Sequence, residues 1–256
     1  MTRATQAAPG ARGPSHLRSH LSDHLDLAEI VDDTLGERLV TLRAADTGGH
    51  RSSANILVHK MYATRGYKSS ADAAQASNLV TLIASERGET VGTISVRFDS
   101  ARGLLADDLF PAELGALRAQ GRRVCEFTKL AMDHIVKSRR VLASLFHAAY
   151  MWAHLRLGFD DVVIEVNPRH VRYYQRMLGF KVMGPERLNH RVDAIAVLMR
   201  LDFDHAREQI ARFAGRSEAS SERSLYPHFF SAKEEAGIVA RLPSTLGDEP
   251  TPKARN

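Results

Sequence analysis

Residues 124–159, VCEFTKLAMDHIVKSRRVLASLFHAAYMWAHLRLGF, contain the transition that decides the fold. The stretch begins as a run typical of a buried strand, around residues 125–132, and ends as an amphipathic helix over about residues 139–157. A cationic loop, HIVKSRR (residues 134–140), joins the two elements and contains no glycine. The free N–H groups at the start of such a helix carry partial positive charge, so the loop lies where an anion can bind. The apolar stripe of the helix consists of Leu142, Leu145, Phe146, Ala149 and Ala153.

The flanking sequence extends this unit to a mixed sheet with helices against it. Before it, the pattern predicts a strand at residues 37–46, a helix at 52–67, a hairpin at 78–99 and a short helix within 104–121. After it come a buried strand at 161–167, a helix at 168–180 that ends at Gly179, and a strand pair formed by 181–184 and 193–203. The fold class predicted from this order is α/β, or mixed α+β, with one central mixed sheet.

Composition bounds the class of protein. The chain has 256 residues and a formal net charge of +5. It lacks an apolar run of the roughly 20 residues needed to cross a bilayer, and its first 20 residues lack the apolar core of a secretory signal. One cysteine, Cys125, excludes an intrachain disulfide framework. We therefore expect a cytoplasmic protein, and the absence of recognition-helix or zinc-finger spacing gives no reason to expect nucleic-acid binding.

The two ends of the chain differ from its centre. Residues 1–25 are rich in Ala, Gly, Pro, Ser, Arg and His without periodicity, which predicts a disordered segment. Residues 26–204 carry the strand and helix pattern of one folded domain. Residues 205–256 are expected to form a helical extension and tail, in which the aromatic cluster LYPHFF (225–230) would rather be covered than exposed.

Two motifs carry a resemblance to a known family. They are LFPAELGALRAQGRRVCEFTKLAMD (109–133) and IEVNPRHVRYYQRMLGF (164–180). Through them the chain resembles the GNAT acyltransferase superfamily and, within it, the long-chain N-acyl amino acid synthases, which are relatives of the acyl-homoserine lactone synthases. The resemblance extends from about Leu39 to Phe203. It implies a GNAT-like fold whose central strands splay apart to admit the pantetheine arm of a thioester donor.

The resemblance also implies a reaction. The expected activity is transfer of a long-chain fatty acyl group from an acyl carrier protein thioester to the amino group of an amino acid. The acyl thioester, on carrier protein or on coenzyme A, would be a co-substrate, and no bound cofactor or metal is expected. Two alternatives remain open: an acyl-CoA-dependent GNAT enzyme acting on another amine, and a non-catalytic protein that binds acyl thioesters or a partner.

Three residues are candidates for catalysis. Glu126 matches the family's carboxylate on the central strand and would act as general base, with burial raising its pKa. Tyr174 matches the general acid of the helix that follows Asn167, although Tyr173 is adjacent and we expect only one of the two rings to face the site. Thr128 could bind the oxyanion or the pantetheine. The competing interpretation of Glu126 is an ion pair with Arg122 or Arg97 that holds the strands in register.

The remaining candidates bind substrate. Asn167 accompanies Tyr174 in the motif, and Arg97 is a candidate on the neighbouring strand. Simple alternation puts Lys129 on the face opposite Glu126, where a surface ion pair is its common fate. A β-bulge would turn Lys129 inward, where it could bind the carboxylate of an amino acid.

The cationic loop departs from the usual pyrophosphate-binding pattern because neither of its registers supplies a glycine. Arginine and lysine side chains suit the single phosphate of a phosphopantetheine and an acidic carrier protein, so we expect carrier-protein docking here, although a solvated basic turn is the ordinary alternative. Cys125 is expected to be a core thiol, and the i, i+7 spacing of His147 and His154 predicts no metal site. The predicted docking residues are Lys137, Arg139, Arg140, Arg169, Arg172 and Arg176.

Overall fold

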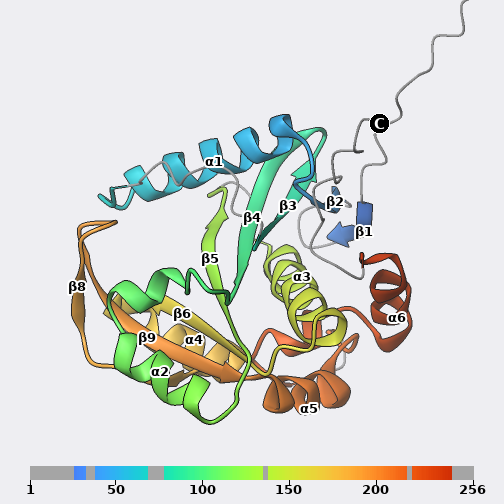
Figure 1. The fold of residues 1–256 in the computed structure, drawn as a ribbon. Helices are drawn as coiled ribbons and strands as arrows, with labels where there is room; N and C mark the ends of the chain where they lie inside the picture. Colours follow the sequence, from blue (N-terminus) through green and yellow to red (C-terminus); the bar gives the residue numbers. More distant parts are fainter. Residues whose placement is uncertain (1–25, 33–37, 69–77, 135–137, 218–220, 244–256) are drawn as a thin grey trace, which may run out of the picture.

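The computed structural model describes residues 26–32, 38–68, 78–134, 138–217 and 221–243. Lys137 and the segments 1–25 and 244–256 lie outside the described residues, so the predictions made for them stay predictions. Within the described part the protein forms one nine-stranded mixed sheet with helices on both faces (Figure 1). This confirms the predicted fold class.

The sheet has a long antiparallel arm and a second arm joined to it by one parallel pair. The strand order is β1-β2-β3-β4-β5-β6-β9-β7, with β8 paired to β9, and among the described strands only β5 and β6 run parallel. The strands are β1 (Asp26–Asp32), β2 (Arg38–Ala44), β3 (Leu79–Glu86), β4 (Glu89–Phe98), β5 (Val124–Met132), β6 (Asp161–Val166), β7 (Lys181–Val182), β8 (Arg187–Asn189) and β9 (Ala194–Asp202).

Helices cover the two faces of the sheet. Along β3, Ile83 packs in the cluster that includes Ala54 of α1, whereas Leu82 packs in the cluster that contains α3, so these two helices lie on opposite faces. Figure 1 shows α1 above β3 and β4 and α3 below them. The helices are α1 (Gly48–Ala63), α2 (Pro111–Ala119), α3 (Arg139–Tyr150), α4 (Val171–Leu178), α5 (Phe203–Phe213) and α6 (Ala232–Arg241).

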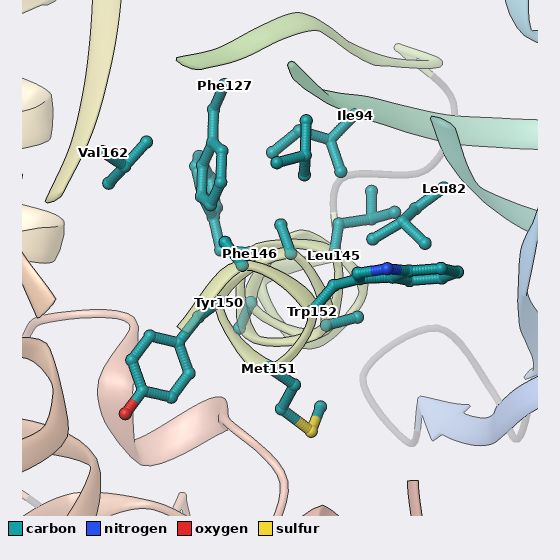
Figure 2. Close-up of a cluster of buried hydrophobic side chains, with 14 of the residues drawn as sticks. Leu82, Ile94, Phe127, Leu145, Phe146, Tyr150, Met151, Trp152 and Val162 are labelled. Atoms are coloured by element: carbon teal, nitrogen blue, oxygen red, sulfur yellow. The ribbon is translucent and has the colours of Figure 1, made fainter. Parts of the chain in front are cut away.

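Helix α3 is the centre of the main core. Ser138 caps it by accepting the backbone N–H of Val141 (3.0 Å), and its apolar residues pack under the sheet, as Figure 2 shows for Leu145 and Phe146. The sequence predicted one helix to about residue 157, but the structure changes at Met151 into a π-helical turn that ends at Arg156. The predicted element is therefore correct in extent and differs in its last turns.

Strand β1 was not predicted. Its two buried side chains, Leu27 and Ile30, are three residues apart, a spacing that resembles a helix more than a strand. The pairing with β2 shifts register between Asp26 and Ala28, so a bulge near Leu27 accounts for the irregular spacing.

Strands β5 and β6 separate after a short contact. They pair only from Val124 to Glu126 of β5 with Asp161 to Val163 of β6, although both continue beyond those residues. In Figure 1, β5 rises toward α1 while β6 stays beside β9. This confirms the predicted splaying of the central strands and leaves an opening in the middle of the sheet.

Candidate active site

A cavity of about 530 Å³ lies at the opening between β5 and β6. Residues of β5 and the end of β6 form its walls, while α1, α3, α4 and the β8–β9 hairpin complete it. Because it extends from the α1 side to the α3 side of the separated strands, two reactants can approach from different directions. Its polar and aromatic lining includes Tyr62, Arg65, Tyr67, Glu126, Thr128, Lys129, Glu165, Asn167, His170, Tyr173, Tyr174, Asn189 and Arg191.

A β-bulge in β5 shapes the wall of this cavity. Lys129 has a φ of 52°, and the pairing of β5 with β4 shifts register between Thr128 and Ala131. A bulge takes a residue out of the ladder and redirects the side chains around it. Consequently five consecutive residues, 126–130, all line the cavity, and Lys129 does so together with Glu126. The prediction from simple alternation, which put Lys129 on the face opposite Glu126, was therefore wrong. The structure agrees with the alternative, in which a bulge turns Lys129 inward.

Glu126 is buried at the base of the cavity, with 1% of its surface exposed. Its Oε2 accepts the backbone N–H groups of Leu105 (2.7 Å) and Ala106 (3.4 Å), whereas Oε1 has no hydrogen-bond partner among the described residues. Burial, reinforced by the nearby Glu165 carboxylate, raises the pKa of Glu126 to about 8. A carboxylate with one oxygen held and the other open is suited to accept a proton near neutral pH.

The ion-pair interpretation of Glu126 is wrong in the described structure. Arg122 binds Asp161 (2.6 Å) and Asp202 (2.9 Å) instead. Arg97 of β4 is the register partner of Glu126 of β5, but its buried Nε has no hydrogen-bond partner, and the residue does not line the cavity. Arg97 therefore has no contact here that supports its predicted role in binding substrate.

A second carboxylate was not predicted. Glu165 Oε2 accepts hydrogen bonds from Arg191 and from Asn189 (3.2 Å), and its buried Oε1 has no partner. Arg191 also donates to Asp108 (2.7 Å). Burial raises the pKa of Glu165 although Arg191 opposes the shift. The signal in the sequence was a Glu inside the otherwise apolar run VVIEV (162–166), but its partners come from residues more than twenty positions away.

The two adjacent tyrosines of α4 both line the cavity. The Tyr174 ring lies edge-on to Phe146 (6.4 Å between centroids) and Phe180 (5.8 Å), and burial raises its pKa above the ordinary value near 10, so the phenol stays protonated. Tyr173 remains 40% exposed at the outer edge. The expectation that only one ring would face the site is wrong because the cavity extends past the edge of the helix.

Asn167 and Thr128 also lie at the cavity wall. Asn167 Oδ1 accepts the backbone N–H of Arg169 (3.2 Å), which shapes the turn from β6 into α4. Thr128 precedes the bulge and pairs with Ser95 in the ladder. The structure thus brings Glu126, Thr128, Lys129, Asn167 and Tyr174 to one cavity.

The predicted docking residues fall into two groups. Arg139 donates to the backbone carbonyl of Arg223 (2.8 Å), and Arg140 lies 3.7 Å from Glu234 and over the ring of Phe230, so both contact the C-terminal extension. The second group lies on or just before α4 beside the cavity and is exposed: Arg169, Arg172 and Arg176.

Comparisons with known proteins identify the family. The sequence profile of the family described as "N-acyl amino acid synthase FeeM" matches residues 53–202. The chain belongs to this family. The structure of FeeM, an N-acyl amino acid synthase from uncultured soil microbes, is similar with 29% identity and a TM-score of 0.63, covering 68% of this chain and 97% of FeeM. The predicted family resemblance is confirmed.

Two further structures show weaker likeness. A putative N-acetyltransferase from Lactobacillus plantarum is 16% identical with a TM-score of 0.45, covering 64% of this chain and 98% of its own. The acyl-homoserine lactone synthase LasI is 12% identical with a TM-score of 0.46, covering 65% of this chain and 91% of its own. A comparison with curated proteins gave no match.

The protein is a GNAT-fold N-acyltransferase of the FeeM family. Among the residues that the structure describes, no group of three or more His, Cys, Asp or Glu side chains could hold a metal ion. None of the described helices has the length and apolar character required to cross a membrane.

Proposed function

We propose that the protein transfers a long-chain fatty acyl group from the phosphopantetheine thioester of an acyl carrier protein to the α-amino group of an amino acid. The observation that supports this most is Glu126, a buried carboxylate whose pKa is raised to about 8 and whose Oε1 is open to a cavity between splayed strands. An amine must lose a proton when it attacks a thioester, and such a carboxylate can receive it.

The reaction needs one bond formed and one broken. The amine nitrogen attacks the thioester carbonyl carbon, the new C–N bond forms, and the nitrogen's proton passes to Glu126. The tetrahedral intermediate collapses with loss of the C–S bond, and the thiolate takes a proton from Tyr174. The products are the N-acyl amino acid and the free pantetheine thiol. Backbone N–H groups of the bulge after Thr128 would bind the oxyanion, because a bulge leaves donors outside the strand ladder.

The acceptor would approach on the side of Glu126. The cations that line the cavity include Arg65, Lys129 and Arg191, and Arg191 forms ion pairs with Glu165 and Asp108. We expect Lys129, which the bulge turns inward beside Glu126, to bind the acceptor carboxylate. Asn167, at the turn from β6 to α4, would bind the pantetheine arm on the opposite side of the opening.

The donor would dock on the exposed arginines of α4. A carrier protein is acidic, and Arg169, Arg172 and Arg176 lie beside the cavity with no carboxylate ion pair in the described structure. Arg139 is next to them, since its guanidinium reaches Met177 of α4. Arg140 is the weakest member of the predicted set because it already faces Glu234. Exposed charges of this kind act mainly on encounter and orientation.

The test compares two donors in wild type and in the Arg172→Glu/Arg176→Glu double variant. We expect kcat/KM for acyl carrier protein to fall and its salt dependence to weaken, while a short acyl-pantetheine thioester reacts as before. The control is Arg207→Glu/Arg212→Glu, the same charge change on α5 away from the cavity. Product mass spectrometry with individual amino acids identifies the acceptor and chain length.

Two results would contradict the proposal. If wild type prefers acyl-CoA over acyl carrier protein, or if both donors lose equally in the α4 variant, the carrier-protein donor is wrong. If no amino acid releases free thiol from any acyl thioester, the amino-acid acceptor is wrong.

A further inference from the structure

A second, smaller apolar void of about 20 Å³ lies behind the aromatic wall of the cavity. Two rings, Phe127 and Phe146, line both spaces and are 6.4 Å apart between centroids. Figure 2 shows these rings side by side over α3, with Tyr150 directed away from them. The inner void is otherwise lined by Tyr150, Leu178, Phe180, Leu201, Phe203, Ala206, Tyr226 and Phe229.

The chemistry of the inner void suits hydrocarbon. A buried water needs two to four polar partners. Here the walls are aliphatic side chains and aromatic rings, and the Tyr226 hydroxyl already donates to the backbone carbonyl of Leu178 (2.7 Å). By its volume the inner void has room for about one or two methylene-sized groups.

Part of this wall comes from outside the family match, which ends at residue 202. Phe203 and Ala206 belong to α5, and Tyr226 and Phe229 belong to the C-terminal extension. The extension is firmly attached: the Phe230 N–H donates to His147 Nδ1 (3.0 Å), which leaves His147 Nε2 to donate to Glu235 (2.8 Å). Burial lowers the pKa of His147, consistent with a neutral ring in these contacts.

We propose that the inner void is the terminal part of the acyl channel, and that α5 and the C-terminal extension limit the acyl chain length this enzyme accepts. This inference rests on the proposed transfer of a long acyl group. Rotation of the Phe127 or Phe146 side chain joins the two spaces, because these rings are the shared wall. A chain that follows the α3 side of the opening then ends against Phe229 and Ala206.

The test uses one substitution that fills the inner void and one that enlarges it. Ala206→Val adds side-chain volume and so fills the inner void. Phe229→Leu removes side-chain volume and so enlarges it. Matched controls are Ala211→Val, an exposed alanine of the same helix, and Phe213→Leu, a phenylalanine that lines neither space. The probes are S-acyl-pantetheine thioesters of increasing length, assayed by transfer to amino acid and, without acceptor, by the rise in melting temperature on binding.

We expect Ala206→Val to shorten the longest well-accepted chain by about two carbons and Phe229→Leu to lengthen it, with about fourfold discrimination per buried methylene. Unchanged length profiles in both variants would overturn the inference while leaving the proposed function intact. A length-dependent melting shift that follows the variants, with no transfer to any amino acid, would support the inference and contradict the function. If Ala206→Val does not fold, the Ala206→Gly variant takes its place and must accept longer acyl chains than wild type. If it does not, the inference is also overturned.

Discussion

Glu126 and Phe127 are neighbours on β5, and their surroundings are opposite in character. Glu126 meets backbone N–H groups, a second carboxylate and Arg191, whereas Phe127 meets Phe146 and Phe203. Alternation along a strand sends successive side chains to opposite faces of the sheet. At the place where β5 leaves β6, Glu126 therefore lies on a polar side of the strand and Phe127 on an aromatic side.

The two residues also differ in how their surroundings act on charge. Burial is the first cause of the raised pKa of Glu126, and the Glu165 carboxylate adds to it. On the polar side Arg191 donates to Glu165, so these two opposite charges near Glu126 are paired with each other. The predictions that follow change one side at a time.

The largest effect is expected for Glu126→Gln. The substitution keeps the volume and an oxygen for the Leu105 and Ala106 N–H groups but removes the proton acceptor, so kcat/KM should fall by about 10²–10⁴. Steady-state kinetics with an acyl-pantetheine donor measure this. Glu113→Gln on α2, which does not line the cavity, should react like wild type. Wild-type rates in Glu126→Gln would remove Glu126 from the mechanism.

The same substitution that lowers activity should make the folded protein more stable than wild type as the pH rises. The folded-state pKa of Glu126 is about 8, above the ordinary glutamate value of 4.5, so the folded protein binds more protons between these values and wild-type stability falls as pH rises through that window. Glu126→Gln lacks this dependence and should gain relative to wild type by at most about 1.4 kcal/mol per pH unit. Urea denaturation at pH 5 to 9 gives the difference, with exposed Glu89→Gln as control. A difference independent of pH would contradict the burial of an ionisable Glu126.

On the aromatic side, Tyr174→Phe should slow turnover less than Glu126→Gln does. The ring contacts with Phe146 and Phe180 remain, so only the proton donor is lost, and water can protonate a thiolate in its place. Single-turnover kinetics with donors of different thiol acidity measure it: the variant should be more sensitive to the leaving group than wild type. Tyr173→Phe is the matched control on the exposed edge, and equal sensitivity in all three proteins would contradict an acid role for Tyr174.

The smallest effect is a shift in pH profile. Because Glu126 must lose its proton to act as base, kcat/KM should rise with pH through about 8. Glu165→Gln removes the negative charge that helps raise the pKa of Glu126, so its profile should move to lower pH, and Arg191→Gln should move it to higher pH. Shifts in the same direction for both variants would show that Glu165 and Arg191 act on fold alone.

The sequence was sufficient where the signals are local. The strand, loop and helix order follows from hydrophobic periodicity, and the resemblance carried by residues 109–133 and 164–180 identified the family and selected Glu126 and Tyr174 as candidates. It missed β1 because the bulge near Leu27 disturbs the alternation on which strand prediction rests.

The sequence was insufficient where a residue's role depends on distant partners. Arg139 and Arg140 were predicted to face a carrier protein, but the extension that contacts them lies more than eighty residues downstream. Glu165 was overlooked because the residues that hold it lie more than twenty positions downstream, Asn189 at the end of β8 and Arg191 in the turn that follows. Neither set of contacts, that of Arg139 and Arg140 or that of Glu165, produces a periodic pattern in the sequence from which it could be predicted.

The sequence by itself determined the order of elements, the family and a carboxylate on the central strand, since these follow from local patterning and motif. The tertiary structure decided what that carboxylate can do. Its raised pKa comes from burial and from Glu165, its fixed oxygen from N–H groups about twenty residues earlier, and its place in the cavity from the separation of β5 and β6. Burial and charge are properties of the space around a residue, and folding brings together the groups that fill that space.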